Sequence, residues 1–212
     1  MEKPLYNKNY FNETSLKSIA AFKKYRQLIE KKIILKNLTI LDLGCAEGNF
    51  ITQVLEENLC YGLDISTHAI DRCKKRFPKI KENFDVLDLN KSSLRKLNIK
   101  FDLITMFDII EHLDNYIYFK KIITNNLKSG GYLVITTPNA NSILRFWRKS
   151  LFTGEIDTTH KALFTPYTLN FFFRRLGVEQ IALFAPFPFY FKNNLITKNI
   201  LLSSQIFAIY KK

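Results

Sequence analysis

The chain has only three cysteines, and no two of them form the C-x-x-C pair of a zinc or redox site. Cys45, Cys60 and Cys73 are therefore expected to be ordinary thiols in a reducing compartment, not members of a disulfide framework. No run of about 18 apolar residues is present, so no membrane-spanning helix is indicated. The first residues also contain no apolar signal-peptide core, which predicts a cytoplasmic protein.

Acidic residues are few: 19 Asp and Glu stand against 32 Lys and Arg, a net charge of +13. Such an excess can indicate a nucleic-acid partner. Here the basic residues form scattered pairs, such as Lys23-Lys24 and Arg174-Arg175, and no single patch. Several pairs lie near expected helix C-termini, where positive charge is favourable. We interpret them as solvated helix surface and expect no nucleic-acid partner.

At 212 residues, 47% of them apolar, the chain has the size and composition of one folded domain. Residues 1–37 are expected to form a helical cap. Its amphipathic helix covers residues 14–33, with Ile19, Phe22 and Ile29 on the inner face. Residues 38–212 are expected to form the main domain, and no internal repeat or linker is visible.

Short apolar strands alternate with helices along the main domain, which is typical of an α/β fold. The expected strands cover residues 40–43, 59–64, 84–87, 103–107, 132–136, 178–184 and 205–210. One helix starts at the cap Ser66 and stops before Pro78. Another covers residues 115–128 and ends at the Gly130-Gly131 pair, and a third runs from Thr165-Pro166 to Gly177.

The most informative segment is ILDLGCAEGNF, in which a strand carrying Asp42 breaks into a turn before a helix. Open α/β sheets build their first ligand-binding turn in this way. A dinucleotide fingerprint would need a glycine at Ala46, and no phosphate-binding G-x-x-x-x-G-K-[ST] segment is present. Glu47 places a negative charge in the turn, which would repel a pyrophosphate and favour a cation. S-adenosylmethionine, a sulfonium nucleoside with an ammonium group, meets this requirement.

From about residue 38 onward the chain resembles the class I S-adenosylmethionine-dependent methyltransferases. LDLGCAEGNF, YGLDIS, NFDVLDLN and FDLITMFDIIEHL resemble the first four family motifs. LKSGGYLVITTPN and THKALFTPYTLNFFFRRLGVE resemble the later segments, in the family's order. The resemblance implies a Rossmann-like α/β fold: a seven-stranded, mostly parallel sheet, with an antiparallel last strand inserted at the sheet edge and helices on both faces. Residues 38–212 would then be the class I methyltransferase domain.

The resemblance also implies which residues bind S-adenosylmethionine. Asp64 is expected to hold the ribose hydroxyls, and Asp88, or alternatively Asp85, to meet the adenine amino group. The complete expected set is Asp42, Gly44, Cys45, Ala46, Gly48, Asp64, Ile65, Asp88, Leu89 and Phe107.

Catalytic groups are expected after the fourth strand, at the carboxyl edge of the sheet. If the chain turns helical after Phe107, then Asp108, Glu111 and His112 share one face. We expect Glu111 and His112 to act there, either directly as a base or as a hydrogen-bonded pair that orients the wall of the site. His160, in THKALFTP, resembles a later family histidine and completes the expected catalytic set.

FDIIEHL also resembles the segment of ubiquinone-pathway catechol O-methyltransferases in which two acids and a histidine hold a divalent metal. The corresponding set here is Asp108, Glu111 and His112. Asp108 is shorter than the acid it replaces, and histidine is an unusual ligand for magnesium. We therefore expect no metal and keep this set as the alternative.

Two segments are candidates for an acceptor lid, residues 143–152 and the aromatic residues 184–191. They predict an apolar or aromatic small-molecule acceptor, with an anionic carrier or lipid as one form of it. The alternatives are contact with a membrane surface, or a core or dimer interface. A monomer and a homodimer both stay open.

The function expected from these features is O-methylation of a small molecule. N-methylation of an amine is an alternative, since a neutral amine needs less help from a base. An RNA methyltransferase is another, although no [DNS]-P-P-[YF] segment or Pro-Cys nucleophile is present. A non-catalytic cofactor-binding protein on the same fold is the third.

Overall fold

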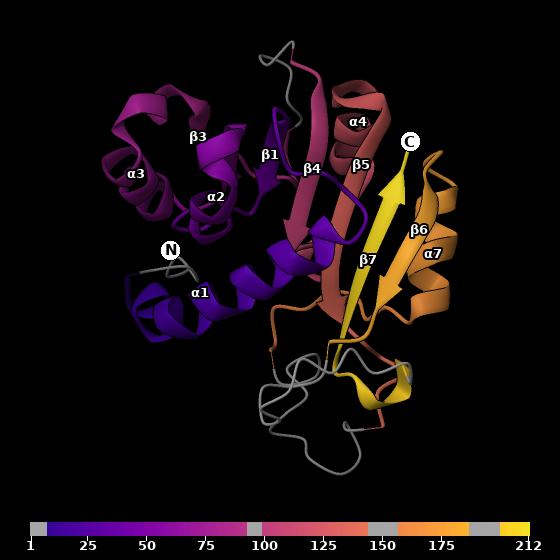
Figure 1. Ribbon diagram of the computed structural model, residues 1–212. Helices are drawn as coiled ribbons and strands as arrows, with labels where there is room; N and C mark the ends of the chain where they lie inside the picture. The colour runs from indigo at the N-terminus through magenta and orange to yellow at the C-terminus, as the bar shows by residue number, and fades with distance from the viewer. Residues whose placement is uncertain (1–7, 93–98, 144–156, 187–199) are drawn as a thin grey trace.

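A single seven-stranded sheet organises the computed structural model, which describes residues 8–92, 99–143, 157–186 and 200–212, with the backbone alone for residues 8–18. The strand order is β3-β2-β1-β4-β5-β7-β6. All neighbouring strands pair in parallel except β7, which is antiparallel to both β5 and β6 (Figure 1). The expected Rossmann-like α/β fold is confirmed. The strands are β1 (Thr39–Leu43), β2 (Leu59–Asp64), β3 (Phe84–Val86), β4 (Phe101–Phe107), β5 (Leu127–Pro138), β6 (Glu179–Phe184) and β7 (Gln205–Lys211).

The last strand does not lie at the sheet edge, so that part of the prediction is wrong. β7 is inserted between β5 and β6, and its residues from Ile206 to Tyr210 are all buried. The unbroken apolar run IFAIY suits a strand that is covered by helices on both faces and by strands on both sides. β6 forms the edge, and its residues are exposed or only partly buried.

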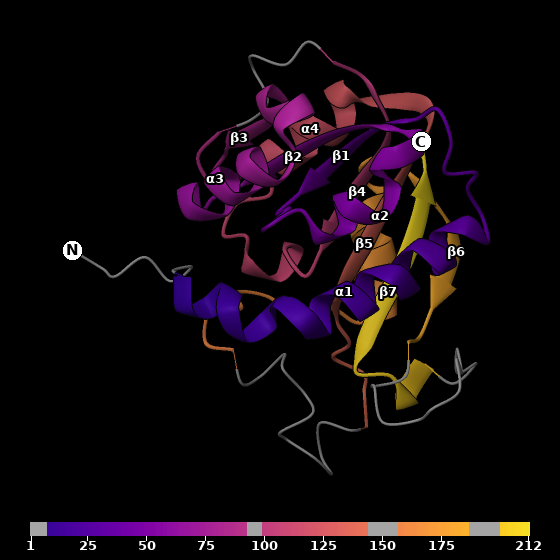
Figure 2. The same ribbon diagram turned by 60° about the vertical axis from the view of Figure 1, so that its left-hand side comes forward.

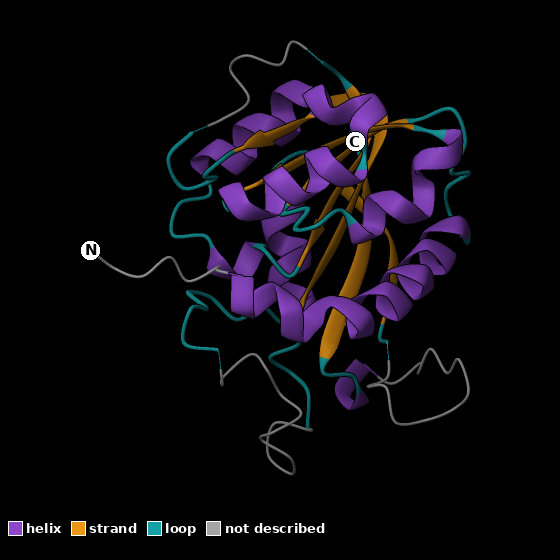
Figure 3. Ribbon diagram, turned by 90° about the vertical axis from the view of Figure 1, so that its left-hand side faces the viewer, coloured by secondary structure: helices purple, strands orange, loops and turns teal. Residues whose placement is uncertain are grey.

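Helices cover both faces of the sheet. The helices α1 (Lys8–Glu30), α2 (Asn49–Val54) and α3 (Thr67–Arg76) pack on one face, which is turned to the viewer in Figure 3. The other face carries α4 (Ile117–Asn126) and α7 (Pro166–Arg174). Short 3-10 turns complete the described elements: η1 (Leu55–Glu57), η2 (Pro78–Asn83), η3 (Ile110–His112) and η5 (Ile200–Leu202). Among the described helices, none combines the length and apolar character needed to cross a membrane.

Two helix starts follow directly from their capping residues, as predicted. The Ser66 hydroxyl accepts a hydrogen bond from the Ala69 N–H at 3.3 Å and caps α3. Thr165 and Thr168 form a reciprocal capping box at the start of α7, with Pro166 in the first turn. These local signals start both helices independently of the tertiary structure.

The N-terminal helix α1 begins at Lys8 and ends at Glu30, so it is longer and lies earlier than the predicted range 14–33. Its buried face consists of Tyr25, Leu28 and Ile29, whereas Ile19 is 41% exposed and was wrongly placed inside. Figures 1 and 2 show α1 running across the sheet near the carboxyl end of β4. The cap therefore covers the edge at which α/β folds bind their ligands.

The helix predicted over residues 115–128 is shorter than expected. α4 ends at Asn126, and β5 begins at the next residue, so the Gly130-Gly131 pair lies inside a strand. The reason is a long-range pairing: the Lys212 backbone pairs with Gly130 (2.7 Å) and Gly131 (2.9 Å). The Lys212 ammonium also donates to the carbonyls of Ile123, Thr124 and Leu127 at the end of α4.

Candidate active site

The turn after β1 has the tight geometry that its sequence predicts. Gly44 and Gly48 take φ angles of 75° and 74°, and Ala46 takes 47°, in the region that favours glycine. A Cβ atom added to Gly44 would lie 2.3 Å from Cδ1 of Ile109, so a larger residue there would displace the Ile109 side chain. The turn is thus packed directly against the segment that follows β4.

Asp64 ends β2 and faces this turn. One carboxylate oxygen accepts a hydrogen bond from the Ala46 N–H (2.9 Å) and the other from the Ser66 N–H (2.8 Å). Burial raises the pKa of Asp64, and these backbone hydrogen bonds act against that rise. Each oxygen keeps a free lone pair, the acceptor pair that a ribose diol requires. The next residue, Ile65, leaves an apolar side chain 49% exposed beside the carboxylate, so the donor set here fits S-adenosylmethionine.

A second acid, Asp42, is buried in β1 below the turn. Its carboxylate accepts a 2.7 Å hydrogen bond from the Thr105 hydroxyl on neighbouring β4. Burial, with a smaller contribution from the charge of Asp64, raises the pKa of Asp42 to about 7. The turn therefore rests on two desolvated acids.

We expect Asp42 to make the ligand-free protein less stable as the pH rises. The raised folded-state pKa means that the native state holds this proton more tightly than the unfolded chain does. Its stabilising contribution is complete below about pH 4 and is lost as the pH rises through about 7. The expected loss is roughly 2–4 kcal/mol. Urea unfolding at pH 5.5 and pH 8.5 measures the part of this loss that falls above pH 5.5, about 2 kcal/mol.

Asp42→Asn is the matched variant, because it removes the titrating group and keeps an oxygen for Thr105. The difference in unfolding free energy between wild type and Asp42→Asn should change with pH by the amount above. A difference that is constant between the two pH values would show that Asp42 is ionised normally in the fold.

The sequence suggested that Glu47 places an unpaired negative charge in the turn, but the structure shows this charge to be paired. Its carboxylate is largely buried and forms an ion pair with Arg72 on α3, with 3.1 Å between Nε and Oε1. Arg72 thus balances the charge that was expected to repel a pyrophosphate. The other carboxyl groups near the turn are those of Asp64 and of Asp42, whose pKa of about 7 leaves it only partly ionised at neutral pH.

The three cysteines are buried and free. A hydrogen bond with Cys73, together with burial, raises the pKa of the Cys45 thiol well above its usual value. The Cys73 thiol itself donates to the Ala46 carbonyl at 3.2 Å. Cys45 is therefore a packing residue of the turn and has no thiolate character at neutral pH.

The expected adenine-side residues follow β3. Asp88 is half-buried beyond the end of the strand, where one carboxylate oxygen accepts from the Asn90 N–H and the other lies 3.2 Å from the Lys91 ammonium. Asp85, the alternative, lies inside β3 and is exposed. Leu89 is buried next to Asp88. The position of Asp88 at the carboxyl edge favours it over Asp85, and the adenine contact stays a prediction.

Phe107, the last residue of β4, anchors an aromatic cluster beneath α1. Its ring stacks on Tyr25 with 5.1 Å between centroids, and Phe22 and Phe50 approach it edge-on at 5.5 and 4.9 Å. Packed aromatic rings of this kind hold a helix firmly in place. The aromatic side chains of α1 and α2 therefore form an apolar wall at the end of β4.

The chain does not turn helical directly after Phe107. Asp108 has a φ of 53° in the left-handed region, and only a short 3-10 turn follows. The Asp108 carboxylate accepts hydrogen bonds from the Gln205 amide (2.8 and 3.0 Å) and the Thr136 hydroxyl (2.9 Å). The Tyr25 hydroxyl donates to the other end of Gln205 at 2.8 Å. Asp108 thus belongs to a network that joins α1, β5 and β7.

Asp108 keeps an exposed surface, yet the surrounding protein desolvates its carboxylate enough to raise its pKa. Glu111 is fully buried, and burial together with the charge of Asp108 raises its pKa well above its usual value. One Glu111 oxygen accepts from the Thr137 hydroxyl at 3.0 Å, and the other finds no hydrogen-bond partner among the described residues. The site therefore contains a buried carboxyl with one unused oxygen.

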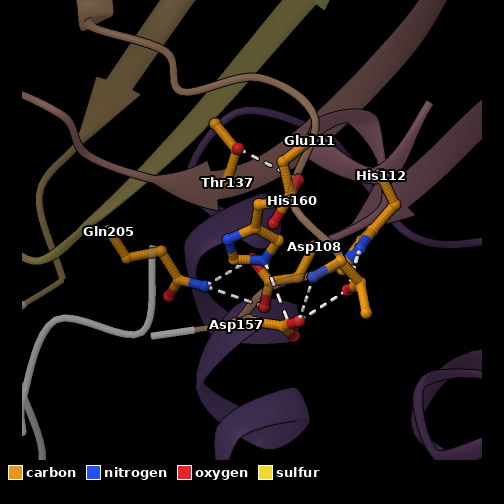
Figure 4. Close-up of polar contacts among 8 residues, drawn as sticks. Asp108, Glu111, His112, Thr137, Asp157, His160 and Gln205 are labelled. Atoms are coloured by element: carbon orange, nitrogen blue, oxygen red, sulfur yellow. Dashed lines mark hydrogen bonds and ion pairs between the residues drawn. The ribbon is translucent and has the colours of Figure 1, made fainter. Parts of the chain in front are cut away.

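His112 and His160 meet beside Glu111, as Figure 4 shows. Their rings lie 4.6 Å apart, centroid to centroid, in an edge-on arrangement. The segment with His160 is fixed by the Lys161 and Ala162 N–H groups, which donate to the Glu111 carbonyl at 2.7 and 3.2 Å. Burial, and then the neighbouring His160, lower the pKa of His112. His112 is therefore neutral at pH 7, the state that can accept a proton.

Glu111, His112 and His160 each offer one ligand atom, and these atoms lie within 4.8 Å of one another. They could together bind one ion. Asp108 is not part of this group, because its carboxylate is held by Gln205 and Thr136. Two imidazoles and one carboxylate suit zinc and do not suit magnesium. The alternative set of Asp108, Glu111 and His112 is therefore not the one that converges.

The expected catalytic residues Glu111, His112 and His160 come together from separate segments, and their roles stay predictions. No sequence pattern pointed to Thr137, Asp157 or Gln205, which together with Thr159 hold these residues and Asp108 in place. Only Thr159 carried a signal, as the neighbour of His160 in THKALFTP. The two segments proposed as a lid fall mostly outside the described residues, apart from residues 143 and 184–186.

A family model described as a methyltransferase domain matches residues 9–183. The chain belongs to this methyltransferase family. Its fold is that of a class I S-adenosylmethionine-dependent methyltransferase domain, and the predicted family, fold and cofactor are confirmed. The role of Asp64 stays a prediction.

Curated relatives of this methyltransferase domain include proteins named ubiquinone biosynthesis O-methyltransferase. The one from Pelagibacter ubique is 29% identical over 148 residues, which are 65% of this chain and 56% of the relative. The mitochondrial one from Candida albicans is 28% identical over 132 residues, 56% of this chain and 37% of the relative. The chain thus spans about half or less of the length of these relatives.

Solved structures show the same fold over nearly the whole methyltransferase domain. A SAM-dependent methyltransferase from Archaeoglobus fulgidus has a TM-score of 0.72 at 23% identity, covering 97% of this chain and 100% of that one. Magnesium protoporphyrin IX methyltransferase from Synechocystis, with bound SAH, has a TM-score of 0.65 at 13% identity, covering 99% and 90%. At these identities the likeness establishes the fold alone.

Proposed function

We propose that this methyltransferase domain transfers the methyl group of S-adenosylmethionine to a hydroxyl oxygen of a small apolar or aromatic acceptor. The observation that carries the proposal is the place of Glu111, His112 and His160. Glu111 and His112 follow β4, which lies next to β1, and His160 joins them from the segment before α7. The turn at Gly44 packs against Ile109, just before Glu111. A proton acceptor thus lies at the sheet edge that holds the cofactor turn.

When bound, S-adenosylmethionine supplies a methyl carbon activated by its sulfonium. Asp64 would hold the ribose, and the backbone of the turn would face the rest of the nucleoside. A hydroxyl is a weak nucleophile and must lose its proton as it reacts. His112 accepts that proton while the oxygen–carbon bond forms and the carbon–sulfur bond breaks, with its electron pair passing to sulfur. Glu111 and His160 form the wall that orients the hydroxyl toward His112.

The relatives support oxygen as the nucleophile, since their names state O-methylation in ubiquinone biosynthesis. The apolar or aromatic nature of the acceptor rests on the composition of residues 143–152 and 184–191. Neither source identifies the compound.

Methyl-labelled S-adenosylmethionine tests the proposal. We expect the labelled methyl group to be transferred to a catechol or phenol that carries an apolar tail. The rate of transfer to the corresponding aniline or benzoate should be lower by about ten-fold or more. The three compounds share ring and tail, so the comparison isolates the nucleophile. Mass spectrometry of the product locates the methyl group.

If only the aniline is methylated, the reaction is N-methylation and not O-methylation. If the protein binds the cofactor but methylates none of the three compounds, the proposed acceptor class is contradicted.

A parallel reaction with EDTA tests the metal alternative. The proposed base needs no ion, so turnover should persist. A loss that zinc restores would instead assign Glu111, His112 and His160 to a metal.

A further inference from the structure

The hydrogen bonds around His112 determine which of its ring nitrogens carries the proton. The Thr159 hydroxyl lies 2.8 Å from His112 Nδ1 and 2.6 Å from Asp157 Oδ1. A hydroxyl has one proton to donate, and a carboxylate can only accept. The Thr159 proton is therefore directed to Asp157. The lone pairs of Thr159 then face Nδ1, which must carry a proton of its own to complete the contact.

The contacts of Asp157 favour its ionised form, which accepts the Thr159 proton. Its Oδ1 accepts both the Thr159 hydroxyl and the Thr159 N–H, at 2.6 and 2.9 Å, and its Oδ2 lies 3.8 Å from His160 Nε2 (Figure 4). Partial burial opposes ionisation, but the hydrogen bonds from Thr159 hold the pKa of Asp157 below its usual range. A charged-acceptor bond of 2.6 Å is also the short, strong kind.

We infer that Asp157 and Thr159 are positioning residues that hold His112 as the Nδ1–H tautomer and leave its Nε2 free to take the acceptor's proton. The inference deepens the proposed function and rests on it for the identity of the reaction. The relay runs from the Asp157 carboxylate through the Thr159 hydroxyl to the His112 ring. This arrangement resembles a histidine base that is oriented by an acid, except that here a hydroxyl lies between the two groups.

The same relay stabilises the ring after the proton has moved. When Nε2 accepts the acceptor's proton, His112 becomes an imidazolium, and its Nδ1–H donates more strongly to Thr159. The Thr159 hydroxyl in turn strengthens its bond to the Asp157 carboxylate. The proton stays on Nε2 until water removes it, and neither Asp157 nor Thr159 gains or loses one. The two residues therefore act through His112 and do not touch the acceptor.

Nitrogen NMR of the uniformly 15N-labelled full chain tests the tautomer directly. The protein has three histidines, so the His112 ring signals are assigned by their loss in His112→Gln. We expect a pyrrole-like shift for Nδ1 and a pyridine-like shift for Nε2 at pH 7.5. A protonated Nε2 with a bare Nδ1 would overturn the inference. The measurement needs neither acceptor nor cofactor, so its outcome is independent of whether O-methylation is correct.

Three variants separate the relay from simple packing. Thr159→Val keeps the size but removes the hydroxyl, and should abolish the Nδ1–H preference and lower kcat about ten-fold with cofactor affinity unchanged. Thr159→Ser restores the hydroxyl and should restore both the tautomer and kcat. Asp157→Asn can still accept the Thr159 proton, so the tautomer should stay while kcat falls.

A Thr159→Val protein that keeps the Nδ1–H tautomer would contradict the relay, whatever its activity. Likewise, a Thr159→Ser protein as impaired as Thr159→Val would show that the side-chain shape matters and the hydroxyl does not. If His112→Ala is inactive but the NMR shows Nε2–H, His112 remains essential and only the relay fails.

Discussion

Replacing His112 with alanine is expected to lower kcat about ten-fold or more, without a change in the affinity for S-adenosylmethionine. The ring is neutral at pH 7 because burial and His160 lower its pKa, and it lies among the residues that follow β4. Removing it takes away a proton acceptor that is needed only while the new bond forms. Such a loss reduces kcat and leaves ground-state binding intact. Steady-state kinetics with calorimetry of the cofactor measures both quantities.

His112→Gln is the control for packing, because glutamine can donate a hydrogen bond but has no basic nitrogen. It should be as slow as His112→Ala. Unchanged turnover in His112→Ala would remove His112 from the mechanism. A fall in cofactor affinity with kcat intact would assign His112 to the cofactor site.

Replacing Asp64 with asparagine should weaken binding of S-adenosylmethionine about 100-fold or more. The carboxylate is held by the Ala46 and Ser66 N–H groups and keeps one lone pair on each oxygen for the ligand. Each hydrogen bond to a charged group contributes about 1.5–3 kcal/mol, and two are expected here. Asparagine loses the charge and turns one acceptor into a donor, which also faces a backbone N–H. Titration calorimetry with S-adenosylmethionine and its demethylated product measures the loss.

Asp71→Asn is the matched control, because it removes an exposed carboxylate of α3 a few residues away and outside the turn. Its affinity should equal that of the wild type within about two-fold. If Asp64→Asn binds the nucleoside as tightly as Asp71→Asn does, Asp64 does not hold the ribose. A folded Asp64→Asn protein is confirmed by its thermal transition.

Much of the fold could be predicted because its signals are local. The apolar runs of the central strands, the cap at Ser66 and the Thr165-Pro166 pair each specify an element within a few residues. Their order along the chain then restricts the topology, since parallel strands are joined by right-handed crossovers. These signals indicated an α/β fold, and the resemblance to the class I methyltransferases implied the seven-stranded sheet with helices on both faces.

The errors in the sheet and after Phe107 involve long-range partners. β7 is inserted between β5 and β6 because its apolar run needs neighbours on both sides. The Gly130-Gly131 pair joins a strand because the distant Lys212 pairs with it and caps α4. The expected helical face after Phe107 gives way to a left-handed Asp108, which Gln205 and Thr136 hold. In each case a partner far along the chain decides the local conformation.

In the candidate site, too, residues in local sequence patterns could be predicted and residues that depend on distant partners could not. The turn at Gly44 and the acids at Asp42 and Asp64 could be found, because strand–turn–helix geometry requires particular residue types at a fixed spacing. Glu111 and His112 were visible as a pair after a strand. Asp157 and Thr159 reach His112 only through the tertiary structure. The pairing of Glu47 with Arg72 was equally hidden, since it joins the turn to another helix.

The central claim is that the turn after β1, with Asp64 beside it, receives a sulfonium nucleoside. Titration calorimetry of the full chain at pH 7.5 with S-adenosylmethionine, its demethylated product and NAD tests it most directly. We predict one site for each of the first two, lost in Asp64→Asn, and no measurable heat with NAD. Uptake of the dinucleotide without binding of either sulfur nucleoside would contradict the account.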